Sequence, residues 1–228
     1  MIDSATPPAS QASPDESAAR RAGAGYDLVI VGGGLAGGLL ALALHRHAPA
    51  CRFLLIEHGA TFGGNHRWSW FASDLPQAGQ DLLAPFAQTI WDEGYAIAFP
   101  DYARTLPTSY CSLSSSDFHA TLMAQLPAEN LMLNTRVAAL DAAGVILGDG
   151  RRIAASRVVD CRHFRPSARL AGGWQVFLGQ HFRCDKPHGL TRPIIMDAKV
   201  DQVAPSGNGG AYRFVYVLPL SADEVFIE

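Results

Sequence analysis

Three glycines near the start of the chain have the spacing of a dinucleotide-binding turn. Gly32, Gly34 and Gly37 form the pattern G-x-G-x-x-G between an apolar run and a helical pattern. In such a turn the first glycine permits a tight bend, the second lets the backbone approach a pyrophosphate, and the third lets helix and strand pack closely. The N–H groups that open the helix then face the phosphates. We therefore predict a nucleotide cofactor held by Gly32, Gly33, Gly34, Leu35, Ala36 and Gly37.

A carboxylate stands where the ribose of that cofactor would bind. Glu57 ends the second apolar run, twenty residues after Gly37, and can accept hydrogen bonds from ribose hydroxyls. Its negative charge disfavours a 2′-phosphate, so FAD or NAD is expected rather than NADP. Gly63 and Gly64 favour FAD, because many flavoproteins place a Gly-Gly turn near the flavin, although a plain turn is the other interpretation. A glycine-rich turn with no ligand at residues 32–37 is the alternative for the whole site.

The elements that must position these residues are short and apolar. Residues 27–31 (DLVIV) and 52–57 (RFLLIE) each predict a parallel strand buried on both faces. Between them, Pro49 ends a helix near His47, and the helix keeps its leucines on one face. Strand, helix and strand together predict a βαβ unit with a right-handed crossover.

The rest of the chain predicts two helices and then many strands. Residues 81–91 and 114–126 are expected to be helical, the second helix being capped by Ser115 or Ser116. Short apolar runs between residues 131 and 161 predict a meander that returns to the parallel sheet. Strand-like runs from residue 174 onward predict an antiparallel sheet. The expected organisation is a disordered leader over residues 1–25, an α/β Rossmann-like domain over 26–170 and an antiparallel-sheet substrate domain beginning at 171 and running to 228.

Composition excludes several functions. The chain has 228 residues, 48% of them hydrophobic, and a net charge of −3, with no basic stripe that would bind nucleic acid. Its four cysteines are scattered without metal-ligand spacing, so we expect reduced thiols and no metal. The apolar stretch at residues 39–44 is too short to span a bilayer, and no signal peptide is indicated. Any membrane contact would therefore be peripheral.

Five segments carry a family resemblance. VIVGGGLAGGLLAL, GGNHRWSW, FLGQHF, KPHGLTRPIIMDAKV and YRFVYVLPLSADEVFIE are together similar to the bacterial lycopene β-cyclases of carotenoid biosynthesis. The resemblance runs from Tyr26 to Glu228, and it is weaker between residues 75 and 150. It adds Asn65 and His66, which follow the Gly-Gly turn, to the predicted cofactor-binding residues.

The resemblance implies a redox-neutral flavoenzyme. Such enzymes use reduced FAD to close β-ionone rings on lycopene and related acyclic carotenes, giving β-carotene, and they need NADPH only to keep the flavin reduced. It further implies a cytoplasmic protein associated peripherally with the inner membrane. Since the family is longer, the chain resembles its N-terminal portion, a Rossmann-like FAD/NAD(P)-binding domain plus part of the substrate domain. We expect residues 1–228 alone to be inactive or poorly active.

Two departures from the family pattern concern glycines. Relatives commonly have Asp-Gly-Arg-Gly where this chain has Asp160, Cys161, Arg162 and His163, so crowding of the backbone near the flavin is expected. Gly37 stands where relatives often have asparagine, which improves the nucleotide-binding pattern.

The resemblance also assigns Glu228 as the catalytic acid. Protonating a carbon–carbon double bond requires a neutral carboxylic acid in a dry site, and burial favours the neutral form. Glu228 follows Val225, Phe226 and Ile227, an environment of that kind. Residues alone would favour a surface glutamate at a strand end, the commonest location of this residue type.

Aromatic side chains are expected to line the substrate pocket and stabilise a carbocation. Tyr212, Phe214 and Tyr216 alternate, so their rings would leave one face of a strand. A hairpin over LPLSADE would bring Glu228 beside Tyr216, whereas a slip of one residue would place it on the other face. A reduced, anionic flavin beneath the same site would add stabilisation. Trp68 and Trp70 are further candidates for the pocket, with core packing as the alternative.

Two other functions fit the same residues. An FAD-dependent monooxygenase-like oxidoreductase would share the βαβ unit and the Gly-Gly turn but would consume oxygen and NAD(P)H. A non-catalytic truncated flavoprotein remnant would bind nucleotide weakly or fold poorly, because it leaves strand edges uncovered.

Overall fold

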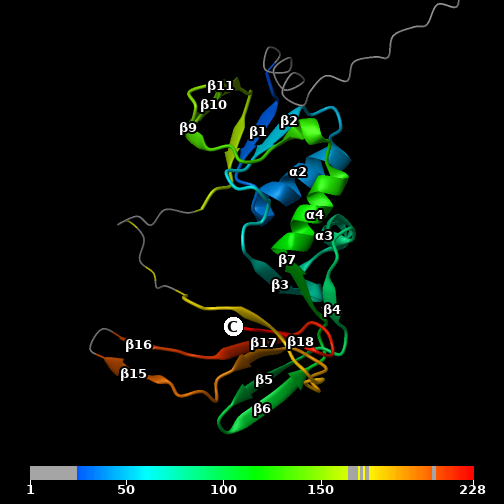
Figure 1. Ribbon diagram of the computed structural model, residues 1–228, viewed down its shortest axis with the longest axis vertical. Helices are drawn as coiled ribbons and strands as arrows, with labels where there is room; N and C mark the ends of the chain where they lie inside the picture. Colours follow the sequence, from blue (N-terminus) through cyan, green and yellow to red (C-terminus); the bar gives the residue numbers. More distant parts are fainter. Residues whose placement is uncertain (1–24, 164–168, 170–171, 173–174, 207–208) are drawn as a thin grey trace, which may run out of the picture. The chain divides into compact units, whose positions relative to one another are not determined.

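The computed structural model describes residues 25–163, 169, 172, 175–206 and 209–228 (Figure 1). The chain divides into two compact units, the first formed by Met1–His66 with Ser115–Phe164 and the second by Arg67–Ser114 with Arg165–Glu228. The expected leader lies outside the described residues except for Gly25. Each unit is described by itself below.

This division differs from the contiguous boundary expected after residue 170. Residues 67–114 leave the first unit and supply strands to the second, because β5 (Tyr95–Phe99) pairs with β14 (Ile194–Asp197). Such a pairing joins segments about a hundred residues apart, and no local pattern signals it. The second unit is therefore built from two separate stretches of chain.

A four-stranded parallel sheet forms the centre of the first unit. Its order is β12-β1-β2-β8, comprising Val158–Asp160, Leu28–Val31, Phe53–Ile56 and Leu131–Met132. Helix α2 (Leu35–His47) connects β1 to β2, which confirms the predicted βαβ unit. All four residues of β2 are buried, as a strand covered on both faces requires.

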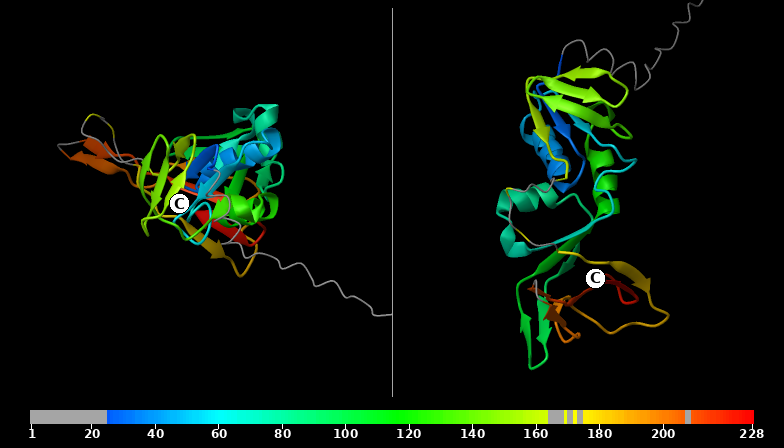
Figure 2. Two further views of the ribbon diagram at one scale, coloured as in Figure 1. Left: turned by 90° about the horizontal axis from the view of Figure 1, so that it is seen from above. Right: turned by 90° about the vertical axis from the view of Figure 1, so that its left-hand side faces the viewer.

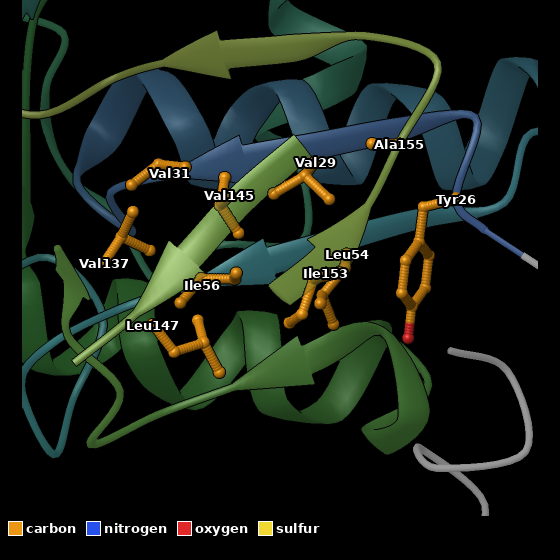
Figure 3. Packing of buried hydrophobic residues seen from close by; sticks show 10 residues of the cluster. All are labelled: Tyr26, Val29, Val31, Leu54, Ile56, Val137, Val145, Leu147, Ile153 and Ala155. Atoms are coloured by element: carbon orange, nitrogen blue, oxygen red, sulfur yellow. The ribbon is translucent and has the colours of Figure 1, made fainter. Parts of the chain in front are cut away.

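An antiparallel meander covers one face of that sheet. It consists of β9 (Val137–Asp141), β10 (Gly144–Leu147) and β11 (Arg152–Ala154), and it precedes β12 as predicted. Figure 3 shows side chains of β1 and β2 interleaved with those of the meander. The buried cluster comprises Tyr26, Val29, Val31, Leu54, Ile56, Val137, Val145, Leu147, Ile153 and Ala155. Burial of this apolar surface holds the βαβ unit against the meander.

A glycine lets two helices of the first unit approach closely. Helix α4 (Ser115–Gln125) packs against α2, and a Cβ added to Gly38 would lie 2.4 Å from Cζ of Phe118 and 2.7 Å from Cδ1 of Leu122. Both α4 side chains are completely buried. The bare backbone at Gly38 therefore makes room for the α4 side chains.

The second unit consists mainly of antiparallel strands. Its largest sheet has the order β13-β18-β17-β14-β5-β6, and only β14 and β5 run parallel. A three-stranded sheet, β3-β7-β4, and a two-stranded ribbon, β15-β16, complete it, the ribbon extending away from the large sheet in Figure 2. The remaining bounds are Arg67–Phe71 for β3, Thr89–Trp91 for β4, Tyr102–Leu106 for β6, Tyr110–Ser114 for β7, Gln180–Arg183 for β13, Val203–Ser206 for β15, Gly209–Ala211 for β16, Val215–Pro219 for β17 and Glu224–Ile227 for β18. The predicted fold class, a Rossmann-like α/β domain with an antiparallel-rich second part, is confirmed.

One predicted helix is partly wrong. Residues 81–91 were expected to be helical, but α3 (Gln77–Leu83) ends before Pro85, and residues 89–91 form strand β4. Proline has no N–H to continue a helical ladder, and β4 pairs with β7 instead. Ser115 and Ser116 lie within the first turn of α4 rather than capping it. No helix in the described part of the chain is long and apolar enough to cross a bilayer.

Substituting Gly38→Ala should destabilise the first unit. The added methyl group would overlap the ring of Phe118, and overpacking costs about 1–3 kcal/mol, part of which alanine's helix propensity offsets. We expect a net loss of about 1–2 kcal/mol in the free energy of unfolding, measured by urea denaturation.

The matched control is Gly148→Ala in the same unit, where the new Cβ would contact Arg136 at an ordinary 3.5 Å. Its effect should remain within about 0.5 kcal/mol. Equal stability of the two variants would show that α4 does not depend on the gap at Gly38.

Candidate functional site

The first glycine of the predicted turn is required by backbone geometry. Gly32 has φ +104°, a conformation that side chains rarely adopt, and its Cβ would lie 2.9 Å from the carbonyl carbon of Cys161. Its N–H donates to the Ile56 carbonyl at 2.8 Å, which ties the turn to β2. The tight bend predicted at this position is confirmed.

Two further glycines are required by packing within the protein. A Cβ on Gly37 would lie 2.0 Å from the Gly32 carbonyl oxygen, and one on Gly33 would lie 2.4 Å from the ring of Phe62. The need for Gly37 was predicted as close approach of helix and strand. The need for Gly33 was not, because Phe62 lies nearly thirty residues away in the sequence.

Gly34 is different, because nothing in the protein lies within 4 Å of where its Cβ would be. It is the N-cap of α2, whose first turn carries no acidic side chain. The N–H groups of Leu35 and Ala36 open that helix and have no intrahelical acceptors. The open space at Gly34 lies at the positive end of the helix dipole, beside N–H groups without intrahelical acceptors. Such a place suits the phosphates of a dinucleotide.

Glu57 is held beside this turn by backbone donors. Its Oε2 accepts the Gly33 N–H at 2.7 Å, its Oε1 accepts the Gly59 N–H at 2.7 Å, and the residue is only 8% exposed. His58 Nδ1 lies 2.7 Å from Oε1. A carboxylate has about four lone-pair sites, so acceptor capacity remains for ribose hydroxyls.

The Gly-Gly turn joins the same site. Gly63 and Gly64 have φ of +83° and +61°, and the Gly63 N–H donates to the Gly33 carbonyl at 2.8 Å. Asn65 and His66 are exposed, and the His66 backbone bonds both ways with Ser115 at the start of α4. The structure therefore brings residues 32–37, Glu57 and the Gly-Gly turn together within one unit.

Cys161 and His163 do not strain the backbone, contrary to expectation. Among the described non-glycine residues only Asn134 has a positive φ. The Cys161 N–H donates to the Val31 carbonyl at 2.8 Å and continues the parallel ladder past β12. Any residue can adopt these conformations, so the missing glycines leave the turn intact.

The predicted hairpin in the second unit is confirmed. The Tyr216 N–H donates to the Glu228 carbonyl at 2.7 Å, and the Glu228 N–H donates to the Tyr216 carbonyl at 2.8 Å. Residues that exchange both backbone bonds are direct cross-strand neighbours with side chains on one face. The carboxyl group of Glu228 and the ring of Tyr216 therefore share a face, and the slipped register is excluded.

That face of the hairpin is apolar next to Glu228 and Tyr216. The next pair along it, Leu218 and Phe226, packs with Trp91 and Tyr110. The Trp91 Nε1–H donates to the Pro219 carbonyl at 3.0 Å, fixing the hairpin to β4. Among the described residues, no hydrogen bond or ion pair involves the Glu228 carboxyl group. Partial burial raises its pKa above the ordinary value for glutamate, so the neutral acid persists to higher pH.

Tyr216 is anchored by other hydroxyl groups. Its hydroxyl oxygen lies 2.9 Å from that of Tyr110, and the Ser69 hydroxyl lies close to both tyrosines. Burial raises the pKa of both tyrosines above the usual range. Both phenols therefore stay neutral at physiological pH.

A series of hydrogen-bonded polar side chains lies next to the pair Tyr110 and Tyr216. The Ser69 hydroxyl donates to Ser112 Oγ at 3.3 Å, Arg67 donates to the same oxygen at 3.2 Å, and Ser112 donates to the Trp68 carbonyl at 3.1 Å. Ser112 is completely buried, and the Arg67 guanidinium lies over the Phe226 ring at 5.8 Å. The sequence analysis did not predict this set of hydrogen bonds, although the alternation in RWSWF places Arg67 and Ser69 on one face of β3.

The other predicted pocket residues lie elsewhere. Alternation along β3 puts Trp68 and Trp70 on the face opposite Ser69, so the structure does not bring them to Tyr216. Tyr212 and Phe214 precede β17, which begins only at Val215, so the expectation of three rings on one strand face is wrong. Their rings pair with each other at 6.1 Å, and Tyr212 is 59% exposed.

A different set of aromatic rings surrounds the tyrosine pair. Phe71, Tyr95 and Trp91 lie 5.0, 6.0 and 6.3 Å from the Tyr110 ring, between centroids. They come from β3, β5 and β4, so no single strand pattern could have indicated them. No three potential metal ligands gather anywhere in the described ranges.

Comparison with known proteins identifies the family. The family model described as lycopene cyclase protein matches residues 27–228. The chain is 44% identical over 202 residues to a lycopene beta-cyclase of Pseudescherichia vulneris and 42% identical over 203 residues to one of Pantoea ananas, each match covering 89% of this chain and 50% and 51% of the relative. The chain thus spans about half the length of the curated relatives it matches.

A solved structure supports the fold. A flavin-dependent halogenase from Xanthomonas campestris superposes with a TM-score of 0.58 at 17% identity, covering 88% of this chain and 54% of the halogenase. At this identity the likeness is one of fold alone, and the fold is that of a flavin-dependent enzyme. The match of the family model over residues 27–228 shows that the chain belongs to the lycopene cyclase family.

Proposed function

We propose that this chain carries the nucleotide-binding turn and the proton donor of a lycopene β-cyclase, an isomerase that closes the end groups of lycopene to β-ionone rings. The observation that carries the proposal is the placement of Glu228, a carboxyl group without a charged partner among the described residues, beside Tyr216 and the apolar pair Leu218 and Phe226. The relatives' names supply the substrate, lycopene. Related acyclic carotenes with the same end group would be accepted equally.

Glu228 would act as a general acid. The neutral carboxyl group transfers its proton to the terminal double bond of the end group, the ring closes on the resulting cation, and a proton leaves a ring carbon. One proton enters and one leaves, so the product is an isomer and no electrons are transferred. Partial burial raises the pKa of Glu228, which favours the protonated donor. Activity should therefore fall as pH rises through that pKa, because the carboxylate has no proton to give.

The aromatic face beside Glu228 would stabilise the cation. Tyr216 is the predicted pocket residue that the structure places next to the acid. An aromatic face contributes about 1–2 kcal/mol to a desolvated cation. Trp68, Trp70, Tyr212 and Phe214 remain candidates for contact with more distant parts of a long polyene.

FAD is the cofactor that the first unit fits. The turn at residues 32–37 would hold the pyrophosphate, Glu57 the ribose, and Gly63 and Gly64 the flavin side. When bound and reduced, with NADPH as the electron source, the flavin would supply negative charge that stabilises a cation. The flavin-dependent halogenase with the same fold supports this assignment.

We further propose a peripheral location on the cytoplasmic face of the inner membrane. Lycopene is a hydrocarbon and dissolves in the bilayer, so an enzyme acting on it gains by contact with the membrane surface. Val176, Phe177 and Leu178 of the second unit are highly exposed and apolar, which suits such contact.

An FAD-dependent oxidoreductase is the second candidate, favoured by the fold likeness to a halogenase. The two functions differ in stoichiometry. An oxidoreductase consumes NAD(P)H and oxygen in proportion to product, whereas a cyclase needs reductant without net consumption. A third outcome, a non-catalytic remnant, would show neither.

Glu228→Gln should abolish cyclisation. We would express residues 1–228 alone, and also joined to the part of the Pseudescherichia vulneris enzyme outside the match, in a lycopene-accumulating host. β-Carotene is expected from the joined protein, and Glu228→Gln should lower its formation about 100-fold or more, because glutamine cannot donate a proton of comparable acidity. Pigments are quantified by chromatography.

The control is Glu224→Gln on the same strand, whose carboxylate pairs with Arg183 and His181 instead of remaining unpaired. It should retain cyclisation within a few-fold. β-Carotene at the normal level from Glu228→Gln would remove Glu228 as the donor.

Gly34→Ala should separate nucleotide binding from folding. Its Cβ meets no protein atom but enters the space assigned to the pyrophosphate, so FAD affinity should fall at least about tenfold while the thermal midpoint changes little. Binding is followed by quenching of flavin fluorescence, with Gly148→Ala as the matched control. Undiminished FAD binding by Gly34→Ala would place the pyrophosphate elsewhere.

A further inference from the structure

Tyr216 lies beside Glu228 in a fixed geometry. The reciprocal backbone hydrogen bonds make these residues direct cross-strand neighbours. Cβ atoms of such pairs are about 5 Å apart, within contact distance of an aromatic side chain. The ring of Tyr216 therefore lies on the same face as the carboxyl group, within reach of it.

The ring cannot swing away from that position without breaking hydrogen bonds. Its hydroxyl is bonded to that of Tyr110, the Ser69 hydroxyl lies close by, and Ser69 is bonded to the completely buried Ser112. Ser112 is held in turn by Arg67 and by the Trp68 carbonyl. The anchor thus reaches from the tyrosine into the β3–β7 sheet.

The charged and titratable groups around the hairpin do not account for the raised pKa of Glu228. On β18 itself, Glu224 is occupied by Arg183 and His181 of β13. From β3, Arg67 lies over Phe226, two residues before Glu228. Tyr110 of β7 and Tyr95 of β5 are the titratable groups on those strands, and burial, with a further contribution from the charge of Asp74, raises the pKa of Tyr110. Within the described part of the chain none of these makes an ion pair with Glu228, and no other side-chain carboxylate is paired with it.

Water exclusion remains as the cause, and the Tyr216 ring is the group placed to exclude it. We infer that Tyr216 has a second, positioning role beside facing the cation: its ring, held by Tyr110 and Ser69, shields the Glu228 carboxyl group from water and so favours the neutral form of that group. The inference rests on the proposed function for its meaning, but the protonation of Glu228 can be measured without any activity. The anchor residues Tyr110 and Ser69 act through Tyr216 and need not touch a substrate.

The test is a titration of Glu228 in the chain of residues 1–228. Protein labelled with ¹³C at the glutamate side-chain carboxyl carbon is titrated by NMR, and the Glu228 signal is assigned from its absence in Glu228→Gln. Tyr216→Ala should move the midpoint downward, toward that of a solvated glutamate, and Tyr110→Phe should move it in the same direction by less. The terminal carboxylate is common to all variants, so differences between them report on the side chain.

Tyr102→Ala is the matched control. Tyr102 is an exposed tyrosine on β6, in the same sheet as the hairpin, and its removal should leave the Glu228 midpoint unchanged. If Tyr216→Ala fails to fold, Tyr216→Phe and Tyr110→Phe still carry the test, because each removes one hydroxyl of the anchor and keeps the ring. An unchanged midpoint in all folded variants of Tyr216 and Tyr110 would overturn the inference.

The joined protein supplies a second readout. Cyclisation by Tyr216→Ala should fall about tenfold or more at neutral pH and recover in part at lower pH, with the loss in kcat rather than KM, because only the loss due to deprotonated Glu228 depends on pH. A uniform loss at all pH values would contradict water exclusion. If the Tyr216 and Tyr110 substitutions shift the Glu228 midpoint but the joined wild-type protein forms no β-carotene, this inference stands and the proposed function is refuted.

Discussion

Two backbone hydrogen bonds between Tyr216 and Glu228 determine what the carboxyl group at residue 228 can do. They set the register of the β17–β18 hairpin, and a slip of one residue would turn every side chain of β18 to the other face. Leu218 and Phe226 resist such a slip, because they pack with Trp91 and Tyr110. The bond from Trp91 Nε1 to the Pro219 carbonyl adds a fixed point at the other end of the hairpin. The environment of the acid is therefore a product of the core of the second unit.

The nucleotide-binding turn obeys a different constraint. Gly32, Gly33 and Gly37 are small because the protein itself occupies the space around them, through Cys161, Phe62 and the turn's own carbonyl. Among the glycines of this turn only Gly34 borders open space, so it is the one position where the protein itself does not account for the missing side chain. The turn would keep its shape with or without nucleotide, since hydrogen bonds from Gly32 to Ile56 and from Gly33 to Glu57 hold it to β2. A preformed site of this kind loses little conformational entropy on binding.

Local patterns predicted those parts of the molecule that local patterns control. The buried strands, α4, the meander, the glycine turn and the β17–β18 hairpin follow from periodicity and turn residues, and the structure confirms them. The helix expected over residues 81–91 failed because pairing of Thr89–Trp91 with β7 outweighed helical propensity. The anchor from Tyr216 to Tyr110 and Ser69 spans more than a hundred residues, and no sequence period connects them. Alternation along β3 indicates that Trp68 and Trp70 share one face of the strand. It does not indicate which face of β3 packs against the β17–β18 hairpin.

Proton delivery by Glu228 without electron transfer is the central claim, and the origin of the added hydrogen tests it most directly. The joined protein would convert lycopene in deuterated water with ordinary NADPH, and the deuterium content of the β-carotene would be measured by mass spectrometry. A carboxyl proton exchanges with solvent, so each ring closed should carry one added deuterium. Rings that form without solvent deuterium would show that the hydrogen comes from a non-exchanging source such as a hydride. That result would contradict the role assigned to Glu228.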